Sequence, residues 1–459
     1  MPAPPDLRQR SLDRAAPLSP LGVVVTSARA VVLMVLAAMV VLPATASAHG
    51  RPASMGRIVE DPLSPGRRVA RATWGLARSD DGTNWRWGCA ASYGVDARNE
   101  DPAIAYARGA IVLGTFEGLL RSTDEGCTWE RPSELLTNVF VVEVVALTPD
   151  RLMAVGALTA QPDQLFESVD AGQTWTRLGA PFGDVVIERL LPAGDVLYAS
   201  GSLADDGEGN RVPTLLRSED GGLRFEATPV PIEEGERGLV VWATALDDAD
   251  VIYAEMLHFN GEPAPERILR SEDAGATWET VLRLPYVGGL VVTPEGVFVG
   301  SRLGGLHHAE DGRSFETIDP DLAVTCLSDL SDGLFVCVDE AISGYALGRW
   351  NGADVDVLTR LSEIDEPMIC APCSDVGAVC PAWEPDIIVD LGLDAELPPD
   401  FDPDAATGAP RDAGLPSECR PESPSPGCGC RLAGSGPRAT NAAVWLCGLL
   451  GLVCLRRRR

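Results

Sequence analysis

Six copies of one short motif recur along the chain at the spacing of a repeat protein. They begin at Ser79, Ser122, Ser168, Ser218, Ser271 and Ala309 and read SDDGTNW, STDEGCTW, SVDAGQTW, SEDGGLRF, SEDAGATW and AEDGRSF. Their central aspartates, Asp81, Asp124, Asp170, Asp220, Asp273 and Asp311, are 43, 46, 50, 53 and 38 residues apart. These are the lengths of four-stranded blades in a β-propeller.

The segments around each motif have the composition of β-strands separated by turns. Runs such as IVLGTFEGLLR precede a motif and short polar runs such as WTRL follow it, with Gly and Pro between the runs. A seventh, degenerate unit lacks the motif and ends at Trp350. Residues 49–362 are therefore predicted to form an all-β, seven-bladed β-propeller, with six or eight blades as alternatives.

The motif has a physical reason for its order of residues. Its aspartate can accept hydrogen bonds from backbone N–H groups of its own turn, and its glycine tolerates φ values that other residues avoid. The closing aromatic residue packs against the blade. These aromatic residues are Trp85, Trp129, Trp175, Phe225, Trp278 and Phe315. The motifs starting at Ser79 and Ala309 are one residue shorter, so their hairpins should differ slightly.

The pattern resembles the Asp-box, or BNR, repeat. That repeat occurs in sialidases, xyloglucan-degrading glycosidases, sortilin ectodomains and photosystem II assembly propellers. The resemblance covers about two thirds of the chain. It implies that the six aspartates and six aromatic residues are structural, because Asp boxes lie on peripheral hairpins and ligands meet a propeller near its central channel.

The N-terminal segment has the features of a secretory signal peptide. Four arginines precede an apolar run over residues 30–42, and Ala46-Ser47-Ala48 has the small-x-small form of a cleavage site. We therefore expect signal peptidase to remove residues 1–48 after Ala48.

The C-terminal segment combines three separate features in order. Cys428 and Cys430 stand in a Gly-Cys-Gly-Cys sequence, residues 439–455 form an apolar run, and four arginines end the chain. The order resembles the MYXO-CTERM sorting signal of myxobacterial surface proteins. The resemblance implies that an intramembrane sorting protease cleaves near Cys428 or Cys430 and that residues 427–459 direct the protein to the cell surface. An ordinary membrane anchor through the helix at 439–455 is the alternative.

The remaining cysteines predict disulfides, because an exported chain meets an oxidising compartment. Cys326 and Cys337 flank a turn and are expected to face each other across a hairpin. Cys370, Cys373 and Cys380 lie in a closing segment over residues 363–383. The sequence disfavours a zinc site at these three cysteines, since no histidine is near them and an oxidising compartment favours disulfides. No metal or cofactor is predicted.

The net charge of −30 disfavours nucleic acid as a partner. Residues 384–426 are rich in Pro, Asp and Glu and are expected to form a solvated linker.

For function, the sequence favours a cell-surface module that binds or scaffolds an unknown protein or glycan without catalysis. The alternative is a sialidase-like glycoside hydrolase. The Arg-Ile-Pro motif of sialidases is missing ahead of the first box. If the chain were such an enzyme, the first residues to consider would be Arg211, which stands in an Arg-Val-Pro sequence, and Tyr253 and Glu255, which are spaced i, i+2.

Overall fold

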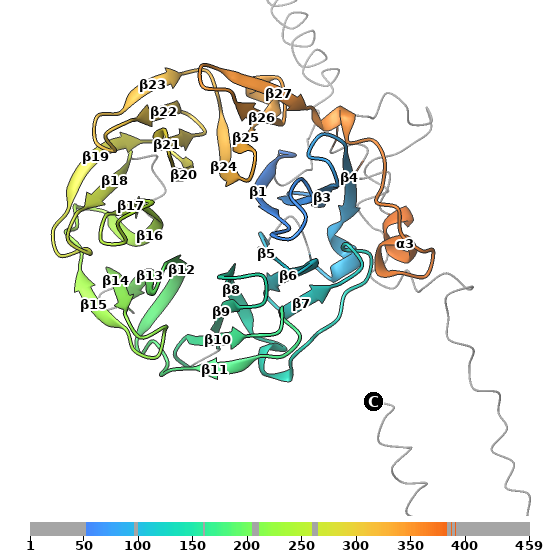
Figure 1. Ribbon diagram of the computed structural model, residues 1–459, viewed down its shortest axis with the longest axis horizontal. Helices are drawn as coiled ribbons and strands as arrows, with labels where there is room; N and C mark the ends of the chain where they lie inside the picture. Colours follow the sequence, from blue (N-terminus) through green and yellow to red (C-terminus); the bar gives the residue numbers. More distant parts are fainter. Residues whose placement is uncertain are drawn as a thin grey trace, which may run out of the picture.

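The computed structural model describes residues 52–95, 100–158, 161–203, 211–258, 265–382, 387 and 391. The signal peptide, most of the acidic linker and the sorting tail lie outside the described residues. Seven antiparallel sheets follow one another along the chain and form a ring (Figure 1). The prediction of an all-β, seven-bladed propeller is therefore confirmed.

Each blade is made from consecutive strands, with the first strand innermost. Blade 1 holds β1 (Met55–Glu60), β2 (Arg68–Ala72), β3 (Gly75–Ser79) and β4 (Trp85–Cys89). Blade 2 holds β5 (Ala103–Ala107), β6 (Ala110–Thr115) and β7 (Gly118–Ser122). Blades 3 and 4 hold β8 (Phe140–Ala146), β9 (Leu152–Ala157), β10 (Gln164–Ser168) and β11 (Thr176–Leu178), then β12 (Val185–Ala193), β13 (Val196–Leu203), β14 (Val212–Ser218) and β15 (Glu226–Pro229). Blades 5 and 6 hold β16 (Glu236–Thr244), β17 (Ile252–His258), β18 (Glu266–Ser271) and β19 (Glu279–Leu284), then β20 (Val287–Thr293), β21 (Gly296–Ser301), β22 (Gly305–Ala309) and β23 (Glu316–Asp319). Blade 7 holds β24 (Val324–Leu330), β25 (Gly333–Val338), β26 (Leu347–Trp350) and β27 (Val355–Thr359).

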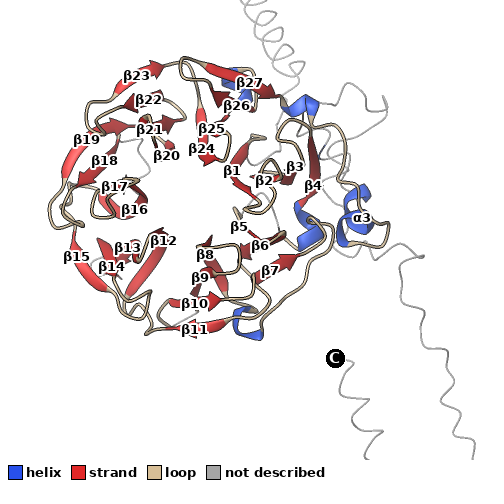
Figure 2. Cartoon of the chain, viewed as in Figure 1, coloured by secondary structure: helices blue, strands red, loops and turns tan. Residues whose placement is uncertain are grey.

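The described helices are short and lie at the outer parts of the ring (Figure 2). They are η1 (Ala90–Tyr93), η2 (Glu134–Leu136), α2 (Glu340–Ser343), η3 (Leu361–Glu363), α3 (Asp375–Val379) and η4 (Cys380–Ala382). None of the helices in the described part of the chain is long and apolar enough to cross a membrane.

The repeated motif follows the third strand of a blade, and in every blade that has it except blade 2 it forms the hairpin to a fourth strand. In blade 5, the carboxylate of Asp273 accepts a hydrogen bond from the backbone N–H of Thr277 at 2.7 Å, and the Ser271 hydroxyl accepts one from Gly275 N at 2.8 Å. Asp124, Asp170 and Asp220 also accept from the residue four positions later. In the two shorter motifs the donor lies three positions after Asp81 and Asp311, so their turns are tighter, as their lengths predicted.

Neighbouring blades share their hydrophobic cores. Between blades 6 and 7, for example, Phe298 and Leu306 pack with Val324 and Val336, and all four side chains are buried. Shared cores of this kind recur around the ring and combine strands from successive blades. A blade cannot bury both of its faces alone, so the ring is stable only as a closed set of blades.

Blades 1 and 7 meet without exchanging a strand, because each sheet is built from consecutive strands. The seam between them is held by contacts of β1 with β24. Thr325 Oγ1 donates to Met55 O at 3.0 Å, and Ile58 N donates to Ser328 Oγ at 3.3 Å.

Residues 364–382, named here the closing strap, continue from blade 7 across the outer edge of blade 1. The backbone N–H of Trp87 on β4 donates to the carbonyl of Glu366 at 3.1 Å, and its carbonyl accepts from Met368 N at 2.8 Å. These two bonds make a short parallel pairing. A disulfide joins Cys380 in the strap to Cys89 at the end of β4. The strap therefore links the C-terminal blade to the N-terminal one.

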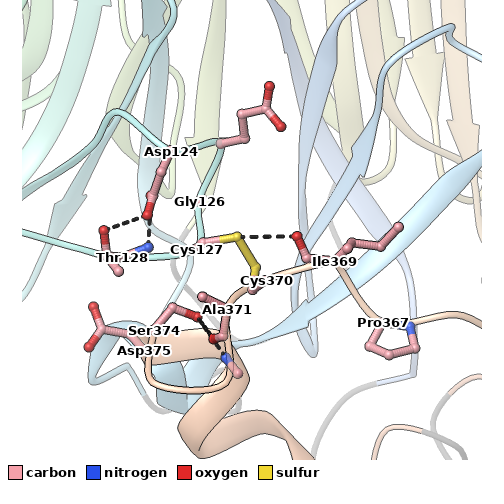
Figure 3. The surroundings of a disulfide bond; sticks show 12 residues. Asp124, Gly126, Cys127, Thr128, Pro367, Ile369, Cys370, Ala371, Ser374 and Asp375 are labelled. Carbon is pink, nitrogen blue, oxygen red and sulfur yellow. Dashed lines mark hydrogen bonds between the residues drawn. A yellow bond between two sulfur atoms is a disulfide. The ribbon is translucent and has the colours of Figure 1, made fainter.

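A second disulfide, between Cys127 and Cys370, fixes the strap to blade 2 inside the motif that contains Asp124 (Figure 3). The carboxylate of Asp375 accepts from Trp129 N at 2.7 Å, and Val376 N donates to Cys127 O at 3.1 Å. Cys373 is disulfide-bonded as well, and Cys326 pairs with Cys337 across the hairpin of β24 and β25. The prediction of disulfides is confirmed for these cysteines.

Replacing Cys127 and Cys370 together by Ser should lower the free energy of unfolding by about 2–4 kcal/mol, because the disulfide spans 243 residues of chain. Chemical denaturation measures the loss, and limited proteolysis should cut within the closing strap. Replacing Cys326 and Cys337 by Ser is the control, since that disulfide spans 11 residues within one hairpin. A strap that stays resistant to protease in the first variant would contradict its role in closing the ring.

Candidate functional site

The innermost strands of all seven blades line a central channel of 840 Å³. A second cavity of 460 Å³ adjoins it and is lined by residues of blades 4 to 7, including Val240, Glu255, Glu266, Tyr286 and Arg302. We call this second cavity the mouth cavity. Five residues line both spaces, and we call them the collar: Glu188, Arg189, Trp242, Gly288 and Thr325.

The collar arises from irregular pairing in the innermost strands. In β12, Ile187 pairs with Gly201 and Arg189 pairs with Ser200, so Glu188 is an extra residue in a β-bulge. The same shift leaves Trp242, Gly288 and Thr325 as extra residues in β16, β20 and β24. Because a bulge changes the direction of side chains, the adjacent residues Glu188 and Arg189 both reach the channel.

Glu188 presents a buried carboxyl group to the channel. Within the described part of the chain, its Oε2 atom has no hydrogen-bond partner. Burial raises the pKa of Glu188 to about 7, against the smaller opposing effect of the positive charge of Arg211. A carboxyl group with such a pKa can hold a proton near neutral pH and give it to a bound molecule.

Glu143 places a second carboxyl group in the wall of the same channel, with different partners. Its Oε1 accepts from Arg57 Nη1 at 2.7 Å, and its Oε2 lies 3.7 Å from Arg189 Nε. Its side chain is only 7% exposed. Two guanidinium groups thus face one buried carboxylate.

Trp242 holds Arg189 in this arrangement. The Arg189 guanidinium lies over the indole ring, 4.5 Å from its centroid. The indole Nε1 donates to Glu255 Oε2 at 2.7 Å. Cation–π contacts of this kind favour a buried arginine. Blades 3, 4 and 5 are therefore connected across the channel wall through Glu143, Arg189 and Trp242.

Glu255 adds a third carboxyl group in the wall of the mouth cavity. It is almost fully buried, and burial is the main reason that its pKa is raised well above the ordinary value. The neighbouring carboxyl group of Glu266 acts in the same direction, whereas the indole of Trp242 acts against it. Glu266 itself accepts from Val287 N at 2.9 Å.

The residues singled out from sequence are only partly brought together. Glu255 lines the mouth cavity, but Tyr253 lies in the core, where its hydroxyl accepts from Arg270 Nε at 3.1 Å. Arg211 lines neither cavity, although its charge acts on Glu188. The six motif aspartates line neither cavity. Among the described residues, no group of three His, Cys, Asp or Glu side chains is placed to hold a metal ion.

Sequence reasoning missed Glu143, Glu188, Arg189 and Trp242. A signal for the first three is visible in hindsight, because FVVEVVA and VVIERLLP place charges inside otherwise apolar strands. Charged residues in such runs are seldom fully buried without a partner or a function. The bulges that turn these side chains into the channel leave no mark in the sequence that we can identify.

Comparisons with known proteins give similar proteins by sequence and by structure. No family model matches the chain. The chain is similar to the xyloglucanase Xgh74A of Acetivibrio thermocellus, with 24% identity over 198 residues, which are 37% of this chain and 23% of that enzyme. The chain thus spans less than a quarter of the curated relative that it matches.

Among solved structures, it is similar to the GH74 xyloglucanase Xcc1752 from Xanthomonas campestris, with 15% identity and a TM-score of 0.43, covering 67% of this chain and 53% of that one. It is also similar to YCF48 bound to D1 peptide, with 15% identity and a TM-score of 0.42, covering 62% and 88%.

The match to the xyloglucanase Xgh74A contradicts the prediction of a binding or scaffolding module without catalysis. It supports the glycoside hydrolase that the sequence left as the alternative. The prediction was wrong for a physical reason. It looked for sialidase-type motifs, which are local in the sequence, whereas Glu143 and Glu188 line the channel from the innermost strands of two different blades.

Glu188→Gln should stabilise the protein at alkaline pH. The folded state retains the Glu188 proton up to about pH 7, whereas an unfolded glutamate loses it near 4.5. The folded protein therefore binds more protons between these values, and the stability that the protonated carboxyl contributes is lost as the pH rises through about 7.

At pH 8 the variant should exceed the wild type by about 1–3 kcal/mol in free energy of unfolding, and at pH 4 the two should agree. Urea denaturation at both pH values measures the difference. Glu226→Gln is the control, because Glu226 is an exposed residue on the outermost strand of the same blade. Equal stability of Glu188→Gln and wild type at pH 8 would contradict the burial of an unpaired carboxyl group.

Proposed function

We propose that this protein is an exported glycoside hydrolase whose active site is the central channel. One observation carries the proposal: two carboxyl groups in different surroundings, Glu188 with an unpartnered oxygen among the described residues and Glu143 between two arginines, line the same channel. Glycoside hydrolysis requires such a pair, one group to donate a proton and one to remain ionised. The similarity to a xyloglucanase supports the same reaction class.

In the proposed reaction, Glu188 donates its proton to the glycosidic oxygen as the bond to the anomeric carbon breaks. The departing sugar leaves as a neutral alcohol. The carboxylate of Glu143 stabilises the positive charge that develops at the anomeric centre. Water then supplies a hydroxyl group to that carbon, and its remaining proton returns to the carboxylate pair.

The arginines near the site favour an uncharged sugar over an acidic one. Arg57 and Arg189 are engaged by Glu143, and Arg302 Nε donates to the buried carboxylate of Asp339 at 3.1 Å. A site for a substrate carboxylate would need guanidinium groups that protein carboxylates do not already occupy. We therefore propose a neutral polysaccharide, with xyloglucan as the first to test.

Glu188→Gln and Glu143→Gln should each lower kcat on a cleaved glycan by about 10²–10⁴-fold, because each removes one of the two required groups. Asp329→Asn is the matched control: Asp329 also lines the channel, and burial raises its pKa too, but it has no part in the proposed chemistry. Release of reducing sugar from xyloglucan and other neutral glycans is the measurement.

The wild-type activity should decline as the pH rises above about 7, where Glu188 loses its proton. Retention of activity in Glu188→Gln, or an equal loss in Asp329→Asn, would contradict the assignment.

We also propose that the propeller is displayed at the cell surface. The described disulfides are those of a protein in an oxidising compartment, which agrees with export. The finer steps rest on the sequence: removal of residues 1–48, cleavage near Cys428 or Cys430 by a sorting protease, and initial retention by the apolar segment 439–455.

Mass spectrometry of the surface protein should show that it lacks its four C-terminal arginines. Replacing Cys428 and Cys430 by Ala should keep those arginines and hold the protein in the inner membrane, because the apolar segment remains. Surface protein that retains Arg459 would identify the tail as an ordinary membrane anchor.

A further inference from the structure

The position of Glu188 restricts which bonds of a polymer can reach it. Glu188 stands in the innermost strand of blade 4, and the channel beside it is lined by all seven blades. The closing strap, which follows blade 7, is locked onto blades 1 and 2 through two disulfides. The blades therefore form a closed ring around the site (Figure 1). From this closure we take the axis of the channel as the route of a ligand.

The two cavities meet at the collar, where the Glu188 carboxyl group stands. On one side lies the mouth cavity, lined by Tyr286 and Glu266. On the other side the channel continues to the turns that follow the innermost strands, at Pro62, Pro149 and Ser331. A glycan with a bond at Glu188 must therefore place sugars on both sides of the collar.

An internal bond of a long polymer carries a chain in both directions, and neither chain can enter a closed ring from the side. A chain end can enter along the axis and bring its bonds to the collar. We propose that this protein acts from the ends of its glycan substrate, with the terminal sugars inserted past the collar. This inference rests on the proposed function and specifies which bonds of the substrate are cleaved.

Tyr286 is placed to receive the part of the glycan that remains outside the collar. Its side chain is 51% exposed in the wall of the mouth cavity. Aromatic rings offer a large apolar face at low conformational cost, which suits the flat faces of sugars. The volume of the channel, 840 Å³, lies within the ordinary range for a ligand-sized pocket, so the inserted end is short.

The first test follows the cleavage of xyloglucan by viscosity and by reducing ends on the same samples. Action from chain ends should release reducing sugar and short products while viscosity stays near its starting value. A rapid fall in viscosity with few new reducing ends would show internal cleavage. That result would overturn this inference and leave the proposed function standing.

The second test needs no catalysis and uses Glu188→Gln protein. A linear xyloglucan oligosaccharide should bind, read by tryptophan fluorescence and calorimetry, and a cyclic glucan should bind at least tenfold more weakly because it has no end. Such end-dependent binding without turnover by the wild type would overturn the proposed function alone. Equal binding of linear and cyclic glycans, or binding of neither, would overturn the inference.

Tyr286→Ala should weaken binding of the linear oligosaccharide about tenfold, by loss of the aromatic face. Leu303→Ala is the matched control, since Leu303 is 61% exposed on the turn that follows β21 but lines neither cavity. An equal effect of both substitutions would contradict the role assigned to the mouth cavity.

Discussion

Closure of the ring is the constraint on which the rest of this structure depends. Each blade buries its faces only against its neighbours, as in the core shared by Phe298 and Val324. The seam between blades 7 and 1 lacks a shared strand, so the closing strap and its disulfides supply the connection there. Only in a closed ring do seven innermost strands face one channel, with Arg57 of blade 1 reaching Glu143 of blade 3.

Within that channel, the extra residue in the bulge of β12 gives Glu188 and Glu143 different charged neighbours. In a regular strand, Glu188 and Arg189 would point to opposite faces and would not share a cavity. The bulge in β12 brings both to the collar. Arg189 then joins Arg57 at Glu143, and the carboxyl group of Glu188 is left buried with an unpartnered oxygen among the described residues. The two carboxyl groups therefore acquire different chemistry from a local irregularity of the backbone.

The motif spacing predicted the blades well because the interactions that form each hairpin join residues close together in the sequence. The carboxylate of Asp273 bonds within its own turn, and the Cys326–Cys337 disulfide spans a single hairpin. By contrast, the disulfides of Cys89 with Cys380 and of Cys127 with Cys370 join residues 291 and 243 positions apart, and eight cysteines allow 105 connectivities. The site was missed for the same reason, since Glu143 and Glu188 carry no motif and come to line one channel only in the ring.

The sequence by itself determined the all-β class and the repeat of the blades, and it favoured seven of them, because alternation, turn residues and local hydrogen bonds act over a few residues. Tertiary structure alone decided which side chains share the channel. That choice depends on where each innermost strand bulges and on how seven blades close into a ring. Both are settled by packing between segments that lie far apart in the chain, and this packing placed Glu188 beside Arg189 and Glu143 in a common cavity.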